Sequence, residues 1–253
     1  MGVRIAIIGG SGMQTLPGLQ LRESVPAATA WGAASAPLQY GTLDGGEVLF
    51  LPRHGSGNVI PPHRVNYRAN IAALAGQGAR WVFAFNTVGG ISPDFTTGTL
   101  AIPDQIIDYT WGREHSFWDD GGSAALHVDF TEPYDRDARQ LLLQGAQTAG
   151  VAVVPGGVYA ATQGPRLESA AEIRRLRRDG CDLVGMTGMP EAGLARELNL
   201  FYACLALVVN PAAGLAPATI ALEDIRRVMA REVPQAVRIL AAAARAVGRS
   251  AVP

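Results

Sequence analysis

Short polar and glycine-rich segments follow several apolar runs of this sequence, at the points where buried strands would end. The side chains in these segments that could do chemistry are Ser11, Arg53, His54, Asn86, Thr87 and Thr187. Ligands of an open α/β sheet bind beyond the carboxyl ends of its strands. Glycines let backbone N–H groups approach an anion, hydroxyl groups can donate to it, and arginine adds a planar cationic fork. The set therefore predicts a phosphate-binding site.

Each of these signals is weak when it is taken alone. The segment GGSGMQTLPG has neither the GxGxxG spacing of dinucleotide sites nor the lysine of a Walker motif, which disfavours NAD and ATP. An Arg-His pair after a strand is usually a surface feature, and Thr187 could simply cap a helix that begins near Pro190. The four histidines lack the spacing of metal ligands, so we expect no metal. Only the convergence of the signals at separate strand ends favours a phosphate site.

The elements that would position these residues alternate between strands and helices. Short apolar runs bounded by glycine, proline or polar residues predict buried strands at 4–10, 47–53, 81–90, 157–165, 182–188 and 202–210. Apolar residues spaced by three and four predict helices over 64–76, 136–149, 168–178, 190–198 and 223–247. The alternation predicts an α/β fold with a largely parallel or mixed sheet. We expect one domain over residues 1–253, with 111–134 as an excursion within it.

Composition and charge narrow the class of partner. With 21 basic against 22 acidic residues, the chain offers no electrostatic reason to bind nucleic acid or an anionic membrane. A hydrophobic content of 48% is ample for a buried core, and no apolar run reaches the roughly 20 residues of a membrane span. Cys181 and Cys204 lie in apolar surroundings without paired spacing, which indicates reduced thiols. We therefore expect a cytoplasmic protein that binds small molecules.

Six segments, in this order, resemble the trimeric purine nucleoside phosphorylase and methylthioadenosine phosphorylase family. They are IIGGSGM, LPRHG, PPHRVNYRANIAAL, NTVGGI, TQGPRLES and VGMTGMPEAGLARELNLFYACLALVVN. The resemblance implies a twisted mixed sheet, a homotrimer, and attack of phosphate on C1′ of a purine nucleoside to release the base and a ribose 1-phosphate. Phosphate is then the co-substrate, and no cofactor is needed. The implied phosphate ligands are Ser11, Arg53, His54, Thr87 and Thr187.

The same resemblance implies how the purine would be recognised. Asn210 ends the last strand, and Pro211 and Ala212 follow it. The methylthioadenosine branch has an aspartate at the position of Asn210 and another at the position of Ala212. An amide can donate to a 6-oxo group and bridge N7, which stabilises charge on the departing purine. Glu168 stands where the 6-oxopurine branch accepts the N1 hydrogen, whereas Leu167 replaces a common aromatic ring. The alternatives are an Asx turn at Asn210 and a helix N-terminal charge at Glu168.

The residues expected to surround the sugar resemble the methylthioadenosine branch rather than the 6-oxopurine branch. Phosphorylases of ordinary nucleosides offer a histidine to the 5′-hydroxyl at the start of the last helix, but this chain reads APATIALEDI there. Ile220 and Leu222 would form an apolar pocket that suits a 5′-methylthio group better than a hydroxyl. By likeness, Met186 would pack against the ribose, and His127 would reach the sugar pocket of a neighbouring subunit. The bland alternatives are core packing for Met186 and simple exposure for His127.

These two ends together predict phosphorolysis of S-methyl-5′-thioinosine to hypoxanthine and 5-methylthioribose 1-phosphate. Asn210, Arg53 and His54 are the predicted catalytic residues. The alternatives are a phosphorylase of inosine and guanosine, a methylthioadenosine phosphorylase, and a purine-binding protein without catalysis. Phosphate dependence separates the enzymes from the last class, and a comparison of substrates separates the enzymes from one another.

Overall fold

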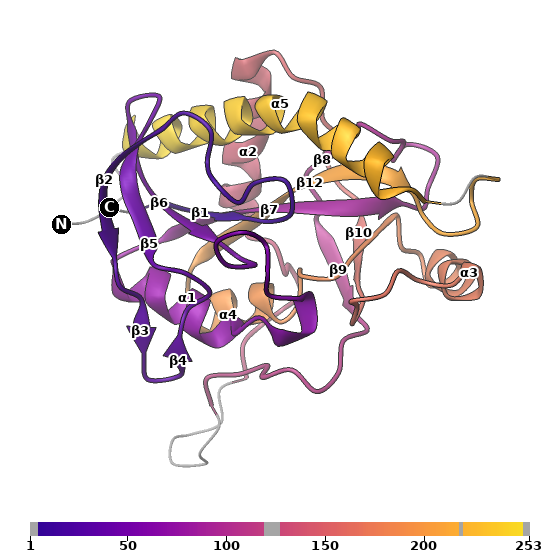
Figure 1. Cartoon of the computed structure of the whole chain (residues 1–253), viewed down its shortest axis with the longest axis horizontal. Helices are drawn as coiled ribbons and strands as arrows, with labels where there is room; N and C mark the ends of the chain where they lie inside the picture. Colours follow the sequence, from indigo (N-terminus) through magenta and orange to yellow (C-terminus); the bar gives the residue numbers. More distant parts are fainter. Residues whose placement is uncertain (1–4, 119–126, 218–219, 250–253) are drawn as a thin grey trace.

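The computed structural model describes residues 5–118, 127–217 and 220–249. Within them one mixed sheet of ten strands runs through the molecule, with helices on both faces (Figure 1). Its main path is β2-β5-β6-β1-β7-β11-β10-β9, and β12 lies on the other edge of β7, where it also pairs with β8. In chain order these strands are β1 (Ile5–Gly9), β2 (Leu19–Val25), β5 (Leu38–Leu43), β6 (Gly46–Pro52), β7 (Trp81–Gly90), β8 (Leu100–Ala101), β9 (Gln105–Asp108), β10 (Val158–Ala161), β11 (Leu183–Gly185) and β12 (Phe201–Pro211).

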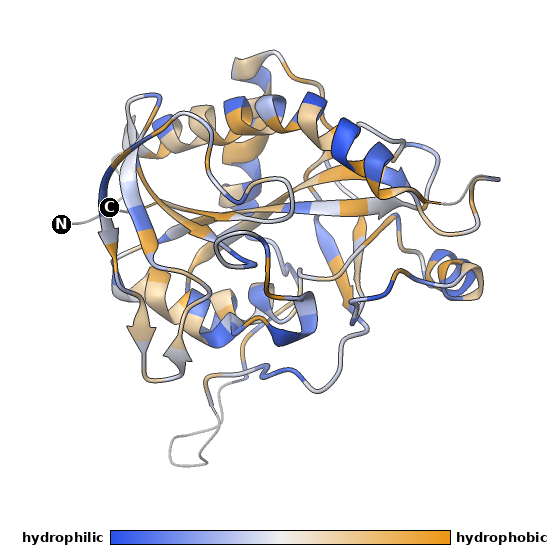
Figure 2. Ribbon diagram, viewed as in Figure 1, coloured by the Kyte–Doolittle hydropathy of each residue, from blue (hydrophilic) through white to orange (hydrophobic). Residues whose placement is uncertain are grey.

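Two layers of helix cover the central strands. Successive residues of β1 illustrate the two faces, because Ile5 and Ile7 pack into one core cluster while Ala6 and Ile8 pack into the other. Helices α2 (Arg136–Ala149) and α5 (Leu222–Arg249) cover the first face, and α1 (Tyr67–Gly76) with α4 (Glu191–Glu197) cover the second (Figure 1). The central strands must therefore be apolar on both sides, as Figure 2 shows.

Most predicted elements are confirmed, with small shifts of their ends. The helix predicted over 64–76 is divided into a short 3₁₀ turn (Pro62–Arg64) and α1, because the side chain of Asn66 caps α1 by accepting a hydrogen bond from the backbone N–H of Ala69. Helix α3 (Ala170–Arg178) begins after a capping box between Ser169 and Glu172. Capping side chains therefore determine where α1 and α3 begin.

The sequence interpretation missed the outer strands. Strands β2 and β5 pair antiparallel at one side of the sheet, and β2 is largely exposed and polar in the sequence LQLRESV. It therefore lacks the buried apolar run that identified the central strands. The two-residue strands β3 (Ala28–Thr29), β4 (Gly32–Ala33) and β8 are too short to leave a pattern. None of the described helices is long and apolar enough to cross a membrane.

The pairing of β7 opens one stretch of its edge. β12 pairs along the whole of one edge of β7, whereas β1 occupies residues 81–84 on the other edge and β11 occupies residues 89–90. β1 runs parallel to β7 and β11 runs antiparallel to it, so their carboxyl ends approach each other from opposite directions. Between them, residues 85–88 of β7 face the loops that follow β1, β6 and β11 rather than another described strand. Such a change of strand direction is where α/β sheets bind ligands.

Candidate active site

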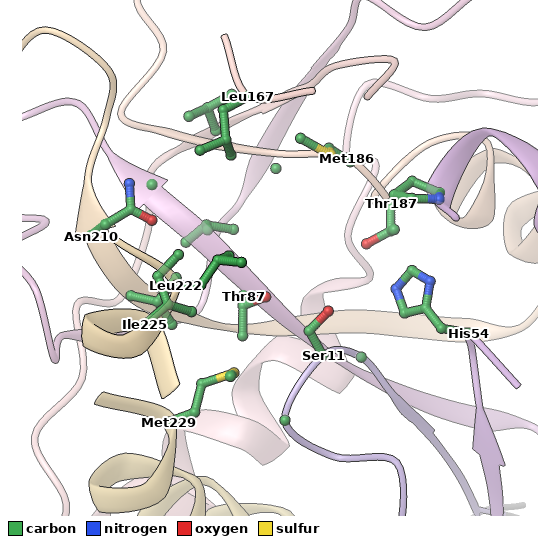
Figure 3. A pocket seen from close by; sticks show the side chains of 18 of the residues that line it. Ser11, His54, Thr87, Leu167, Met186, Thr187, Asn210, Leu222, Ile225 and Met229 are labelled. Carbon is green, nitrogen blue, oxygen red and sulfur yellow. The ribbon is translucent and has the colours of Figure 1, made fainter. Parts of the chain in front are cut away.

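A cavity of about 490 Å³ lies at this open stretch of β7. Figure 3 shows side chains from β7 and β12, from the loops after β1, β6, β10 and β11, and from the start of α5, turned toward a common space. The predicted residues that line it are Ser11, Arg53, His54, Thr87, Leu167, Glu168, Met186, Thr187, Asn210, Ala212, Ile220 and Leu222. The cavity therefore joins the predicted phosphate, base and sugar residues in one site.

Three predicted residues do not line this cavity. Asn86 is 1% exposed and lies beneath it. Pro211 lines an adjoining apolar pocket of about 250 Å³ instead. His127 is exposed and belongs to neither. Any contact of Asn86 with substrate would thus be indirect, and any contact of His127 would need another subunit.

The deepest residue of the site is Arg53, whose guanidinium group is completely buried. Its Nε and Nη2 donate to the two carboxylate oxygens of Glu191 at 2.7 and 2.8 Å, and Nη1 donates to the carbonyl of Phe85 at 3.0 Å. Burial alone would lower the pKa of Arg53, but the Glu191 carboxylate outweighs it and the pKa is raised. The positive charge of Arg53, which the sequence analysis assigned to phosphate binding, is therefore already balanced by the Glu191 carboxylate. One Nη1 hydrogen is left for a ligand.

Asn86 links Arg53 to the far side of the site. Its carbonyl oxygen accepts from Nη2 of Arg53 at 3.3 Å, and its amide nitrogen donates to Oγ1 of Thr187 at 2.8 Å. Because that hydroxyl accepts from Asn86, its own hydrogen remains available to donate into the cavity. The alternative of Thr187 as a helix cap is wrong, since α4 starts from Pro190 without a side-chain cap. Asn86 thus prepares Thr187 as a donor.

His54 is held in one tautomer. Its Nδ1 lies 2.8 Å from the carbonyl oxygen of Ile60, which can only accept, so Nδ1 carries the hydrogen. Burial, and then the neighbouring charge of Arg53, lowers the pKa of His54 below its ordinary value of 6.5. The ring is therefore neutral at pH 7, and Nε2 is an acceptor. A hydrogen phosphate dianion can donate its own hydroxyl hydrogen to that nitrogen.

Glu168 and Asn210 lie at the base end of the cavity. Oε1 of Glu168 accepts from the hydroxyl of Thr162 at 2.6 Å, which leaves the second oxygen for a ligand. Glu168 takes no part in capping α3, because Ser169 and Glu172 form that capping box.

Asn210 owes its orientation to an irregularity in β12. The register between β12 and β7 shifts between Val208 and Asn210, and such a bulge re-aims a side chain. The amide nitrogen of Asn210 donates to the carbonyl oxygen of Pro211 at 2.6 Å. In an Asx turn the side-chain oxygen would accept from the backbone N–H of Ala212, but that N–H donates to the carbonyl oxygen of Gly90 at 2.8 Å, so the Asx-turn alternative is wrong. The amide also lines the cavity (Figure 3). One hydrogen of the amide nitrogen is used by Pro211, and the second is left to donate to a base.

The first two turns of α5 line the end of the cavity that is predicted to hold the sugar. Leu222, Ile225 and Met229 from this helix line the cavity together with Ile220 (Figure 3). The sequence analysis predicted the helix over 223–247 but named neither Ile225 nor Met229 as a site residue. The apolar face of this helix extends past the edge of the sheet and becomes a ligand wall. Glu191 was also missed as a site residue, although it belongs to the segment GMTGMPEA.

The described residues contain no group of three or more histidine, cysteine, aspartate or glutamate side chains that could hold a metal ion.

The model of the phosphorylase superfamily matches residues 4–245 of this chain. The chain belongs to this superfamily. A probable S-methyl-5′-thioinosine phosphorylase of Pseudomonas syringae pv. tomato is 53% identical over 224 residues, which cover 88% of this chain and 91% of that protein. A protein of the same description from Xanthomonas campestris pv. campestris is 56% identical over 212 residues, covering 84% of this chain and 85% of the relative.

Two further likenesses bear on base and fold. The 6-oxopurine nucleoside phosphorylase of Pyrococcus furiosus is 42% identical over 245 residues, covering 95% of this chain and 91% of that protein. A methylthioadenosine phosphorylase from Schistosoma mansoni, solved with adenine, superposes with a TM-score of 0.94 at 29% identity, covering 98% of this chain and 93% of the other. These findings confirm the predicted family and the predicted α/β fold. They also show that the chain is an enzyme, because the proteins of this family that it matches are phosphorylases.

The buried pair between Arg53 and Glu191 yields a stability prediction. Replacing Glu191 with Gln removes the counter-charge of a fully buried guanidinium group, so the free energy of unfolding should fall by about 3–5 kcal/mol. Denaturant unfolding followed by circular dichroism measures this. The matched control is Glu47→Gln, whose pair with Arg22 is about half exposed and should change stability by less than about 1 kcal/mol. Equal effects in the two variants would contradict the importance of the buried pair.

Proposed function

We propose that this enzyme catalyses the phosphorolysis of S-methyl-5′-thioinosine to hypoxanthine and 5-methylthioribose 1-phosphate. The observation that carries the proposal is the single cavity in which 6-oxopurine readers and an apolar sugar wall flank a set of anion donors. Glu168 offers a free carboxylate oxygen to the N1 hydrogen of hypoxanthine, a hydrogen that adenine lacks. The wall from Ile220 to Met229 suits a methylthio group. The Pseudomonas and Xanthomonas relatives are described as probable S-methyl-5′-thioinosine phosphorylases.

The chemistry requires the chain to hold two reactants and stabilise charge. As the bond from C1′ to N9 breaks, its electron pair moves onto the purine, and a phosphate oxygen forms the new bond to C1′. The proton lost by the hydrogen phosphate dianion ends on the purine, so that neutral hypoxanthine and the dianionic sugar phosphate are released. Ser11, Thr187 and the remaining Nη1 hydrogen of Arg53 would donate to phosphate, and Nε2 of His54 would accept from it; their position in the lining of one cavity supports these roles. Asn210 would stabilise the purine by donating to the 6-oxo group. Phosphate is itself the nucleophile, so we propose no cofactor.

A general 6-oxopurine nucleoside phosphorylase is the second candidate. The 42% identity to the Pyrococcus furiosus enzyme favours it, and both candidates need the same base readers. They differ at the 5′ position, where inosine carries a hydroxyl group that Leu222, Ile225 and Met229 leave without a partner. An unpaired hydroxyl in an apolar site costs about 1–3 kcal/mol. We therefore expect methylthioinosine to be favoured over inosine by roughly 10- to 100-fold in kcat/KM.

A product assay with four nucleosides tests the proposed function. Methylthioinosine, methylthioadenosine, inosine and adenosine are incubated with the enzyme, with and without phosphate, and the released base is quantified. We expect methylthioinosine to have the highest kcat/KM and every turnover to require phosphate. Faster turnover of inosine would favour the second candidate, and faster turnover of methylthioadenosine would contradict the assigned base. Base release without phosphate would contradict a phosphorylase.

Replacing Asn210 with Asp tests the base assignment. A carboxylate cannot donate to a 6-oxo group, and one of its oxygens would face the carbonyl of Pro211, now 2.6 Å from the amide nitrogen. The kcat/KM for methylthioinosine should fall by about two orders of magnitude, the effect of removing one oxyanion-type donor. Methylthioadenosine, whose amino group can donate to the new carboxylate, should lose less. The readout is the ratio of kcat/KM for the two substrates, since a folding defect depresses both.

The control for this experiment is Asn199→Asp, an exposed turn residue that follows α4. It adds the same charge away from the cavity and should leave the substrate ratio unchanged. An unchanged ratio in Asn210→Asp as well would contradict the proposed role of Asn210 at the base.

We further propose a homotrimer in which His127 enters the sugar pocket of a neighbouring subunit. Support comes from the exposure of His127 and from Trp111, which is 71% exposed on the same excursion. Trp118, at the last described residue before the gap, is 39% exposed. Exposed aromatic side chains are typical of interfaces. The free and buried state of Cys181 and Cys204 supports a reducing, cytoplasmic location.

Sedimentation at assay concentration tests the assembly. We expect a species of three chains, and we expect His127→Ala to raise the KM for methylthioinosine while the trimer persists. His115→Ala is the control, because His115 lies on the same excursion and pairs with Asp108 of its own chain. A fully active monomer would rule out the shared site.

A further inference from the structure

Arg113 carries a buried cation that the chemistry described above does not use. It lies on the excursion that follows β9, outside any helix or strand, and only 8% of it is exposed. Its guanidinium group packs over the ring of Tyr67, with 5.4 Å from Cζ to the ring centroid. Arg53 is also buried but has a carboxylate partner, whereas none of the ion pairs among the described residues includes Arg113. Such burial of a charge is costly unless other groups compensate it.

The compensation comes from backbone carbonyl groups of two separate loops. Nη1 donates to the carbonyl oxygens of Met186 at 2.9 Å and Met189 at 2.6 Å. Nη2 donates to the carbonyl oxygens of Thr162 at 3.3 Å and Gln163 at 2.8 Å, and Nε donates to Oε1 of Gln163 at 3.2 Å. One planar fork therefore ties residues 186–189, after β11, to residues 162–163, after β10.

These two loops carry opposite ends of the site. Met186 and Thr187 line the cavity on the sugar and phosphate side. Thr162 holds the carboxylate of Glu168 through the 2.6 Å hydrogen bond at the base end. Strands β10 and β11 are parallel neighbours, but each loop has left the sheet before it reaches the ligand. Thr162 bonds to Gly185, and the side chain of Met186 packs against Gly164. Arg113 adds directed hydrogen bonds to both loops beyond the strands.

We propose that Arg113 is a positioning residue, which fixes the separation between the base reader Glu168 and the phosphate donor Thr187. The inference rests on the proposed function only in requiring that base and phosphate occupy this cavity together. Phosphorolysis needs the phosphate oxygen and C1′ in near-attack geometry, and a misplacement of about 1 Å can cost about 100-fold in rate. Arg113 acts through the loops it joins and does not itself line the cavity.

Arg113→Ala and Arg113→Lys test the proposal with the nucleoside that the wild-type enzyme turns over fastest. Positioning predicts a fall in kcat of about 100-fold in Arg113→Ala, while the KM for phosphate and for nucleoside each change by less than about threefold. Guanidinium ion at non-denaturing concentration should restore part of the lost kcat, and sodium chloride at equal ionic strength should not. Lysine keeps the charge but offers a single ammonium instead of a fork, so Arg113→Lys should lose kcat by more than about tenfold.

The control is Arg136→Ala, an exposed arginine at the start of α2, which should keep wild-type kinetics with or without guanidinium. If Arg113→Ala fails to fold, the folded Arg113→Lys variant decides by its kcat. Wild-type kcat in either folded variant would overturn the proposal, as would a loss in Arg113→Ala that guanidinium does not reverse. A wild-type enzyme that releases no base with phosphate would instead refute the proposed function, so the two failures are distinguishable.

Discussion

The buried ion pair between Arg53 and Glu191 is the interaction on which the arrangement of the site depends. It joins the end of β6 to the first residue of α4, across 138 residues of sequence, and it sits against the carbonyl of Phe85 on the open edge of β7. Tyr202 of β12 also donates to Glu191, at 2.8 Å. A charge that cannot be solvated demands all these partners at once. These contacts hold the segments after β6 and β11, which carry the proposed phosphate ligands, close to the open edge of β7.

This arrangement also explains how a neutral pair can serve an anion site. Arg53 brings directed hydrogen-bond donors, while its full positive charge is balanced by Glu191. The groups beside it, Ser11 and Thr187, are neutral donors, and His54 is a neutral acceptor by virtue of its bond to Ile60. Phosphate would therefore be recognised by hydrogen-bond geometry more than by net charge. Such a site should lose little affinity with added salt, because screening acts on charges.

The sequence predicted the fold well wherever burial leaves a pattern. The central strands and α2 were visible because both faces of the sheet are covered and the strands are apolar throughout. The edge strand β2 could not be predicted because it is largely exposed to solvent and so lacks a buried apolar run. Residues of the site that follow strands, such as Ser11 and Thr187, could be predicted from their position. The charge balance of Arg53 and the role of Arg113 could not, because each depends on partners that are distant in sequence and identified only by packing.

The separate origins of the three parts of the cavity have a consequence for how such enzymes diverge. The proposed anion donors come from the loops after β1, β6 and β11, the proposed base readers from the loop after β10 and from β12, and the proposed sugar wall from the first turns of α5. A lineage can therefore exchange one substituent preference for another through a few replacements on one element, while the bond-breaking apparatus stays intact. Gly12 and Met229 are where two of these parts touch, since a Cβ at Gly12 would lie 2.7 Å from the sulfur of Met229. That contact limits which side chains can be exchanged at the sugar wall without disturbing the loop that carries Ser11.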